Sequence, residues 1–412
     1  MPRTVPDWAR VSFALVAIGW GANQFAPMVQ VYRQQVSLSA STATALFGLY
    51  AAGLVPTLLV AGWWSAHRGK RPFVRFGAVT SLVSSLVLAV NTHHTGGLLL
   101  GRILAGVAIG AAMAPGTAWV KQLSSGSPGI GARRATVALS TGFGGGALVA
   151  ALLTELPHPT VLPYLVHLLV AMAAAVLVWR TPELDQAALD LTERPAPRAG
   201  TVVTALRSRW FLAWVPLTAP WVFGSATLSF LALPTGVGAT AGPLAAHVVL
   251  LIGVGAAVTL GTGVALQPTI RQVEDAHPGV TLPTGLAVLI AALALAAVSR
   301  THHPLLPVAW VVFGAAYGLL LVGGLRTIET HTPVEVLAPV SAVFYALTYI
   351  GFAAPWTMTV ATRGQGVGRF SFGGVLAAGA AVALLGLVVG WSVARLDRPG
   401  VEPAVGEDSR QT

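Results

Sequence analysis

One arginine stands inside an otherwise apolar stretch of this sequence and is the first candidate for chemistry. Arg102 lies within LLLGRILAGVAIG, which carries no other charge. A charge inside a membrane-spanning segment costs free energy and usually faces a cavity or a partner, so Arg102 is a candidate coupling residue. Glu155, which closes the next apolar run, is a candidate counter-ion. The alternative is that Arg102 lies close enough to the end of its run for the guanidinium to reach the membrane surface.

The composition around Arg102 indicates that lipid is the solvent for most of the chain. Of its 412 residues, 55% are hydrophobic and 9% are charged, and the mean hydropathy is +0.73. Apolar side chains in this proportion cannot all be buried in a water-soluble core. The net charge of +10 does not indicate nucleic acid, because we identify no stripe of basic residues interleaved with aromatic residues on one exposed face.

Apolar runs long enough to cross a membrane divide the sequence into two sets of six. A span needs about 20 apolar residues, and its backbone must be helical where it meets lipid. We therefore predict an all-α integral membrane protein with twelve spans. Their residues are 11–31, 41–64, 73–91, 98–120, 135–154, 161–179, 210–232, 244–266, 281–298, 304–325, 338–361 and 371–394.

The polar segments between these runs predict orientation and domains. Basic residues concentrate on one side of the predicted membrane, which places both termini in the cytoplasm. The predicted units are an N-terminal six-helix bundle (1–181), a cytoplasmic linker (182–209), a C-terminal six-helix bundle (210–398) and a disordered tail (399–412). The excess of Ala, Gly and Arg, with few Lys, favours a bacterial source, so we expect a bacterial inner membrane.

An internal repeat relates the two sets of runs. AGVAIGAAMAPG contains Gly106 and Gly110, and FGAAYGLLLVGG contains Gly314 and Gly318 at the same spacing, offset by 208 positions. Tandem halves of equal helix number have parallel topology and bind substrate near the membrane midplane, where the halves meet. Rocking about that interface would expose the site to each side in turn.

These features together resemble the major facilitator superfamily over the whole chain. The likeness rests on the twelve runs, the long central linker, the short loop between the second and third runs, and the position of Arg102. GRILAGVAIG is similar to the family's R-x-x-x-G signature, matched by Arg102 and Gly106, in which the arginine is linked to proton coupling in many members. The resemblance implies a secondary active transporter, similar to bacterial, actinobacterial-type drug-efflux members with twelve spans.

A second signature of the family lies between the second and third runs. GWWSAHRGKRP is similar to G-x-x-x-D-R-x-G-R-R, with Gly62, Gly69, Lys70 and Arg71 in register. Ala66 replaces the signature Asp, which in the family helps to latch one conformation, so this latch is altered here. The basic residues also suit a purely structural role at helix ends and at an anionic membrane surface.

The fifth run bears on the direction of transport. GFGGGALVAA is similar to the G-x-x-x-G-P-x-x-G-G signature of efflux members, with Gly142 and Gly146 matched and Ala147 in place of Pro. Small residues four apart also allow two helices to approach closely in any transporter. The match favours efflux, and an uptake permease for a small nutrient or metabolite is the alternative.

The position of the acidic residues predicts the substrate class. Every Asp and Glu lies in a loop, in a tail or at the edge of a run. Transporters of lipophilic cations commonly place an acid at depth, so we expect a small neutral, zwitterionic or anionic substrate. The proton is the expected coupling ion. His167 and His247 are candidates to carry it, or else are hydrogen-bonded where helices meet.

Polar and aromatic residues in the middle of the runs are candidates to line the substrate cavity. A buried amide needs a partner, and two amides beside Pro27 indicate a bend where substrate binds or, alternatively, a bond between helices. The cavity candidates are Asn23, Gln24, Tyr50, Trp221, Tyr345 and Tyr349.

Other classes of function lack their sequence signals. No metal-binding H-E-x-x-H pattern and no phosphate-binding glycine loop followed by Lys and Ser or Thr occurs, so we expect no catalytic residues, no metal and no cofactor. The expected partners are a small-molecule substrate, a proton and the lipid bilayer, but no nucleic acid. We expect the protein to act as a monomer.

Overall fold

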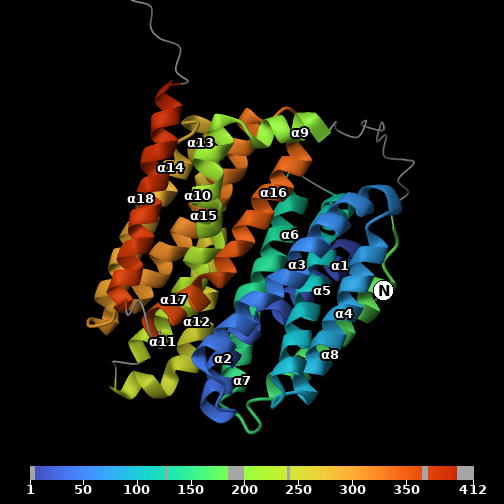
Figure 1. Cartoon of the computed structure of the whole chain (residues 1–412). Coiled ribbons are helices and arrows are strands. Elements are labelled where there is room, and N and C mark those ends of the chain that lie inside the picture. The colour runs from blue at the N-terminus through green and yellow to red at the C-terminus, as the bar shows by residue number, and fades with distance from the viewer. Residues whose placement is uncertain (1–4, 126–128, 184–198, 239–241, 364–369, 397–412) are drawn as a thin grey trace, which may run out of the picture.

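The chain folds into helices joined by turns, in two bundles that lie side by side (Figure 1). The computed structural model describes residues 5–125, 129–183, 199–238, 242–363 and 370–396, and these contain no strand. The predicted tail and most of the predicted linker lie outside the described residues. The linker's described part includes a short helix, α9 (Ala199–Leu206).

Helices α1 to α8 contact one another and form the N-terminal bundle, called the N-half. Its elements are α1 (Asp7–Asn23), α2 (Phe25–Gln35), α3 (Ala40–Arg68), α4 (Arg71–Val90), α5 (Thr95–Leu123), α6 (Ile130–Ser140), the π-helical turn η1 (Thr141–Gly145), α7 (Gly146–Leu153) and α8 (Leu162–Trp179).

Helices α10 to α18 form the second bundle, called the C-half. Its elements are α10 (Arg209–Thr227), the π-helical turn η3 (Leu228–Ala232), α11 (Leu233–Gly238), the 3-10 turn η4 (Gly242–His247), α12 (Val248–Ala265), α13 (Gln267–Ala276), α14 (Thr281–Ser299), the 3-10 turn η5 (His303–Leu305), α15 (Leu306–His331), α16 (Leu337–Tyr349), the 3-10 turn η6 (Ile350–Ala353), α17 (Ala354–Arg363) and α18 (Phe372–Leu396).

Eleven helical segments of the described chain are long and apolar enough to cross a membrane. They correspond to the second to twelfth predicted runs. The first predicted run, 11–31, is not among them, because it is divided at Gln24 into α1 and α2. Pro27 has no N–H to donate to the carbonyl of Asn23, which weakens the helix at this point. The helix is therefore interrupted beside Pro27, where the sequence predicted a bend.

The packing of the two halves repeats the pattern in the sequence. Gly106 and Gly110 of α5 lie directly against the backbone of α3, and Gly314 and Gly318 of α15 lie against the backbone of α12. At the same offset of 208 positions, η1 interrupts the fifth run and η6 interrupts the eleventh. The same small residues therefore produce the same close helix contacts in both halves.

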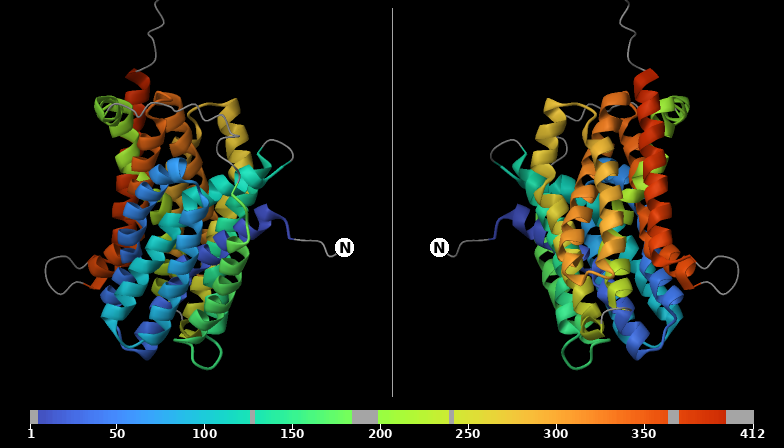
Figure 2. Two further views of the ribbon diagram at one scale, coloured as in Figure 1. Left: turned by 90° about the vertical axis from the view of Figure 1, so that its right-hand side faces the viewer. Right: turned by 90° about the vertical axis from the view of Figure 1, so that its left-hand side faces the viewer.

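Contacts between the halves gather toward one end of the molecule. They are made chiefly by α12 with α2, η1 and α7, and by η6 and α17 with α3. Figure 1 shows α2, α7 and α17 toward the lower end, called here the α2 end, and α9 and α13 at the upper end, called the α9 end. Figure 2 shows from two sides that the long helices run between these two ends.

The close approach of α5 to α3 makes a prediction about stability. A methyl group at Gly106 would overlap the carbonyl oxygen of Tyr50, whereas one at Gly261 of α12 would meet open space. We expect Gly106→Ala to cost about 1–3 kcal/mol and to lower the melting temperature in detergent. Gly261→Ala is the matched control and should be neutral or slightly stabilising, since Ala favours helix. Equal melting temperatures for the two variants would contradict this packing.

Candidate functional site

Three consecutive residues at the α1–α2 break each bind a different helical span. The carbonyl oxygen of Ala22 accepts a hydrogen bond of 2.9 Å from Arg102 of α5. The Asn23 amide donates to the carbonyl oxygen of Phe143 in η1 at 2.8 Å. The Gln24 amide donates to the Ser85 hydroxyl of α4 at 2.9 Å. The break is therefore a junction at which four spans of the N-half are joined by polar contacts.

Arg102 is the charged group of this junction, and its side chain is 0% exposed. Besides Ala22, its guanidinium donates to the carbonyl oxygens of Leu46 at 3.2 Å and Phe47 at 3.0 Å, both in α3. The rings of Phe25 and Tyr50 each lie 4.7 Å from the guanidinium carbon. Charge-assisted hydrogen bonds and aromatic faces together offset the loss of water around this cation.

Two expectations about Arg102 are wrong in this structure. Glu155 is exposed at the end of α7, and the guanidinium is bound by carbonyl oxygens, so Glu155 is not its counter-ion. Arg102 also does not reach the membrane surface, because its side chain is fully buried and bonded to α1 and α3. The sequence indicated the depth of Arg102 but not its partners. Those partners are main-chain carbonyl oxygens, which every residue type has, so the sequence cannot single them out.

An aromatic cluster connects the Arg102 site to the C-half. We define it as Phe47, Tyr50, Phe223, Phe230, Tyr349 and Phe352. Tyr50 meets Phe352 edge to face at 4.7 Å between ring centroids, and Phe47 meets Phe230 at 6.2 Å. The same Tyr50 ring that covers Arg102 therefore also contacts the opposite half.

Within the C-half, the cluster continues along α10 and α16. Phe223 stacks on Tyr349 at 4.9 Å and lies 5.0 Å from Phe352. The Tyr349 hydroxyl lies 3.5 Å from the sulfur of Met113 in α5, which is a further contact between the halves. Aromatic pairs of this kind are worth about 0.5–1.5 kcal/mol each beyond their buried area.

Five of the six predicted cavity candidates fall into three groups in the structure. Tyr50 and Tyr349 lie in the aromatic cluster between the halves. Asn23 and Gln24 are buried inside the N-half, where they join helices. Trp221 packs its ring against Gly379 of α18.

The last predicted candidate, Tyr345, is half-buried on α16. Its ring meets Phe344 of the same helix at 5.9 Å. The structure thus brings together Tyr50, Tyr349 and Arg102, and it does not bring Trp221 to them.

The glycines of the two central signatures are packing residues. Gly106 faces the carbonyl oxygen of Tyr50, so the α5–α3 contact holds the ring that covers Arg102. Gly142 lies against the carbonyl oxygen of Val16, and Gly146 lies against Trp20, which brings span five onto α1. The packing alternative raised for the fifth run accounts for both positions.

The loop between α3 and α4 is organised by a carboxylate from the end of α8. Glu183 accepts hydrogen bonds from the backbone N–H groups of Lys70 at 2.6 Å and Arg71 at 3.2 Å. An anion at a helix N-terminus is favourable, because the first N–H groups have no partner within the helix. Burial lowers the pKa of the Lys70 ammonium, and the Glu183 carboxylate opposes this shift.

The signature glycines of this loop differ in their surroundings. Gly69 has φ of 84°, a conformation that favours glycine, and a side chain there would collide with Glu183. Gly62 is exposed on α3 with nothing close to it. Glu183 therefore accounts for Gly69 by local structure and binds the backbone of Lys70 and Arg71, without the signature Asp that Ala66 replaces.

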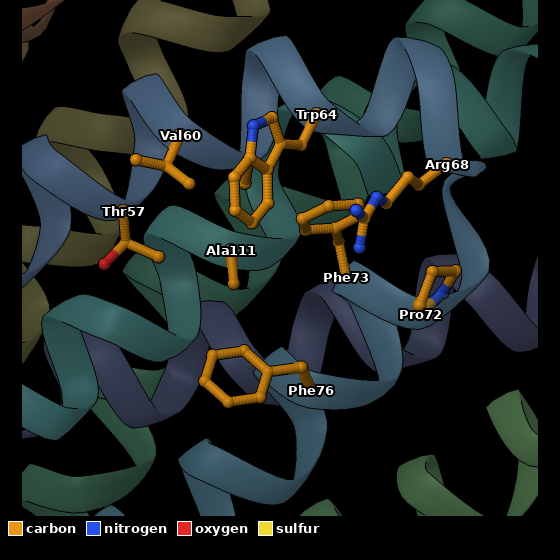
Figure 3. Close-up of a pocket in the computed structure, with 9 residues that line it drawn as sticks. Thr57, Val60, Trp64, Arg68, Pro72, Phe73, Phe76 and Ala111 are labelled. Carbon is orange, nitrogen blue, oxygen red and sulfur yellow. The ribbon is translucent and has the colours of Figure 1, made fainter.

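A pocket of about 340 Å³ lies away from this site, between α3, α4 and α5 (Figure 3). Figure 3 shows Val60 and Trp64 from α3, Phe76 from α4 and Ala111 from α5 around it. Val60, Trp64 and Phe76 are 49%, 44% and 54% exposed, so the pocket opens on the outside of the bundle. None of the residues that line it belongs to the Arg102 site or the aromatic cluster.

The two helical bundles, their repeated packing and the arginine buried in the N-half are features of a membrane transport protein. The chain belongs to the Major Facilitator Superfamily, whose family model matches residues 11–355. It is thus a multi-pass integral membrane protein and a transporter.

Solved structures of transporters share this fold. A variant of the nucleoside transporter NupG superposes with a TM-score of 0.74 at 10% identity, covering 94% of this chain and 98% of that chain. A variant of the peptide transporter POT in complex with sulfate gives 0.72 at 15% identity, covering 95% of each chain. No curated protein sequence matches the chain. At these identities the similar structures show the fold alone.

Several residues of the site were not among the predicted candidates. Aromatic residues are common in membrane spans, and so is serine. For this reason the sequence did not single out Phe47, Ser85, Phe223 or Phe352. Their importance comes from which helices cross, and this depends on contacts between distant parts of the chain. The spacing of Phe47 and Tyr50 on one face of α3, close to Gly48, is a local signal from which a contact surface could have been predicted.

The ring of Tyr50 makes a testable contribution to the Arg102 site. Tyr50→Leu removes the aromatic face over the guanidinium, which we expect to cost about 2 kcal/mol. Tyr50→Phe is the matched control, because it keeps the ring and its contacts with Arg102 and Phe352. Melting temperatures in detergent measure both variants. If Tyr50→Phe lowers the melting temperature as much as Tyr50→Leu, the ring is not the stabilising group.

Proposed function

We propose that this protein is a proton-coupled secondary active transporter that exports a small neutral, zwitterionic or anionic apolar compound by alternating access. The observation that carries the substrate class is the buried Arg102, which has no carboxylate partner among the described residues. The described carboxylates lie in the segments between helices or within the first or last turn of a helix. A fixed positive charge in a medium of low dielectric repels cations and attracts anions.

The proposed topology has twelve spans with both termini in the cytoplasm. In this proposal α1 and α2 together cross the membrane as one interrupted span, so each half contributes six. The basic residues at the α9 end, including Arg71, Arg75 and Arg133, support the cytoplasmic assignment of that end by the positive-inside rule. We place the protein as a monomer in a bacterial inner membrane.

The contacts between the halves support alternating access. Since the halves meet chiefly toward the α2 end, the structure corresponds in this topology to the conformation that faces the cytoplasm. To face outward, the protein must separate Tyr50 from Phe352 and Phe47 from Phe230, and bring the α9 ends of the bundles together. Gly142 and Gly146, which hold span five against α1, keep the N-half rigid during this movement.

Uptake of a nutrient is the second candidate function. It is favoured by the similar structures, which are described as transporters of nucleosides and of peptides. The fold supports movement in either direction. The partial match of the fifth run to the efflux signature supports export.

Substrate-dependent proton movement in inverted membrane vesicles tests the proposed function. We expect some neutral or anionic compounds of a broad panel, and no cationic ones, to dissipate an imposed pH gradient. Arg102→Ala should abolish this movement, since the junction loses its cation and three carbonyl oxygens lose their donor. Glu155→Gln is the control and should leave the movement unchanged, because Glu155 is exposed.

Two outcomes of this experiment would contradict the proposal. Proton movement with cationic compounds only would overturn the substrate class. If a compound accumulates in right-side-out vesicles when an inward proton gradient is imposed, the protein is an uptake transporter and the proposed export is wrong.

A further inference from the structure

His167 of α8 is a buried titratable group that the junction at the α1–α2 break includes. Its side chain is 0% exposed, as is that of Ser85. His167 Nε2 lies 2.9 Å from the carbonyl oxygen of Ala17, and Nδ1 lies 2.7 Å from the Ser85 hydroxyl. The same hydroxyl receives the Gln24 amide at 2.9 Å. Gln24, Ser85 and His167 thus form one continuous chain, called here the relay.

The acceptor at one end determines the direction of every bond in the relay. A carbonyl oxygen only accepts, so Nε2 of His167 carries a hydrogen and donates it to Ala17. In the neutral imidazole, Nδ1 then accepts from the Ser85 hydroxyl, and the hydroxyl oxygen accepts from the Gln24 amide. This arrangement leaves the other atom of the Gln24 amide, Oε1, buried and without a hydrogen-bond partner.

The unpartnered oxygen of Gln24 allows the hydrogen bonds of the relay to reverse their donor-to-acceptor direction. If a proton binds to Nδ1 of His167, this nitrogen donates to the Ser85 oxygen, and the hydroxyl must find an acceptor. Half a turn of the Gln24 amide places Oε1 where the amide nitrogen lay and supplies that acceptor. The hydrogen bond from Nε2 to Ala17 stays in place, so one proton is accommodated by rotating two polar groups.

We propose that Gln24, Ser85 and His167 form a proton-binding site of the transport cycle. Its role in transport rests on the proton-coupled function proposed above. The proton comes from water and forms the Nδ1–H bond of an imidazolium, and its release reverses the step.

Among the described groups around His167, the imidazole is the one that can take up a proton. Ala17, Trp20 and Gly21 of α1 and Ser85 of α4 lie against its ring, and none of these residues carries a carboxylate or an amine. Tyr164, one turn earlier on α8, is bonded to the Tyr32 hydroxyl at 3.0 Å. Arg102 lies at the same break, where it holds the Ala22 carbonyl oxygen.

Trp20 covers one side of the relay. Its ring stands edge-on to the His167 ring at 5.9 Å, and Trp20 itself is only partly buried. Rotation of this side chain would open His167 to water from that side. Because Gln24 is two residues from Ala22, a turn of its amide acts on the same break that Arg102 holds, which couples the proton to the conformation of α1 and α2.

Nitrogen-15 NMR of histidine-labelled full-length protein in lipid nanodiscs tests the relay directly. His167→Gln identifies the His167 signals by their loss. At alkaline pH we expect the tautomer with hydrogen on Nε2, and on acidification we expect conversion to the doubly protonated ring. Ser85→Ala should reduce the proton affinity of His167 about tenfold, since the imidazolium loses the acceptor for its Nδ1–H. The exposed His94 should be unaffected by Ser85→Ala.

The outcomes separate this inference from the proposed function. If His167 keeps one neutral tautomer at every pH at which the protein is folded, or if Ser85→Ala leaves its proton affinity unchanged, the relay is not a proton site. Proton movement that persists in vesicles with His167→Gln would likewise exclude its role in coupling, while proton-coupled transport itself would stand. If His167 titrates as expected but no compound moves protons, the proton site stands and the proposed function fails.

Discussion

Burial of one guanidinium away from water is the constraint on which the centre of this structure depends. A cation in a membrane interior must be satisfied by the protein, and Arg102 is satisfied by main-chain oxygens of α1 and α3 and by two aromatic faces. This brings α1 and α3 close to α5 and places Tyr50 over the charge, and the interruption of α1 lies beside the Ala22 contact. The break at Gln24, the glycine at position 106 and the aromatic cluster are therefore parts of one arrangement.

The arrangement also links the two processes that the proposed function couples, proton binding and movement of the halves. On one side of the α1–α2 break, Arg102 connects through Tyr50 to Phe352 and the opposite half. On the other side, Gln24 connects through Ser85 to His167. A change in either contact acts on the same few residues of backbone. Coupling between a proton and the movement of the halves thus needs no long path through the protein.

The sequence predicted the parts of this arrangement that depend on local pattern. Apolar length located eleven of the spans, and the depth of Arg102 and the glycine repeat followed from spacing along single helices. It did not predict the partners of Arg102 or the Ser85–His167 contact, because those depend on how separate helices cross. The sequence correctly predicted that Glu155 lies at the end of its span. A similar depth in the membrane was not enough to predict a contact with Arg102.

The halves are proposed to rock about the aromatic cluster, and distances between spin labels test this most directly. The chain has no cysteine, so labels can be placed on Arg133→Cys with Glu335→Cys near the α9 end, and on Ser41→Cys with Thr357→Cys near the α2 end. Phe352→Ala, which weakens the contact with Tyr50, is expected to shorten the first distance and lengthen the second. Distances that stay unchanged, or that both lengthen, would contradict the account.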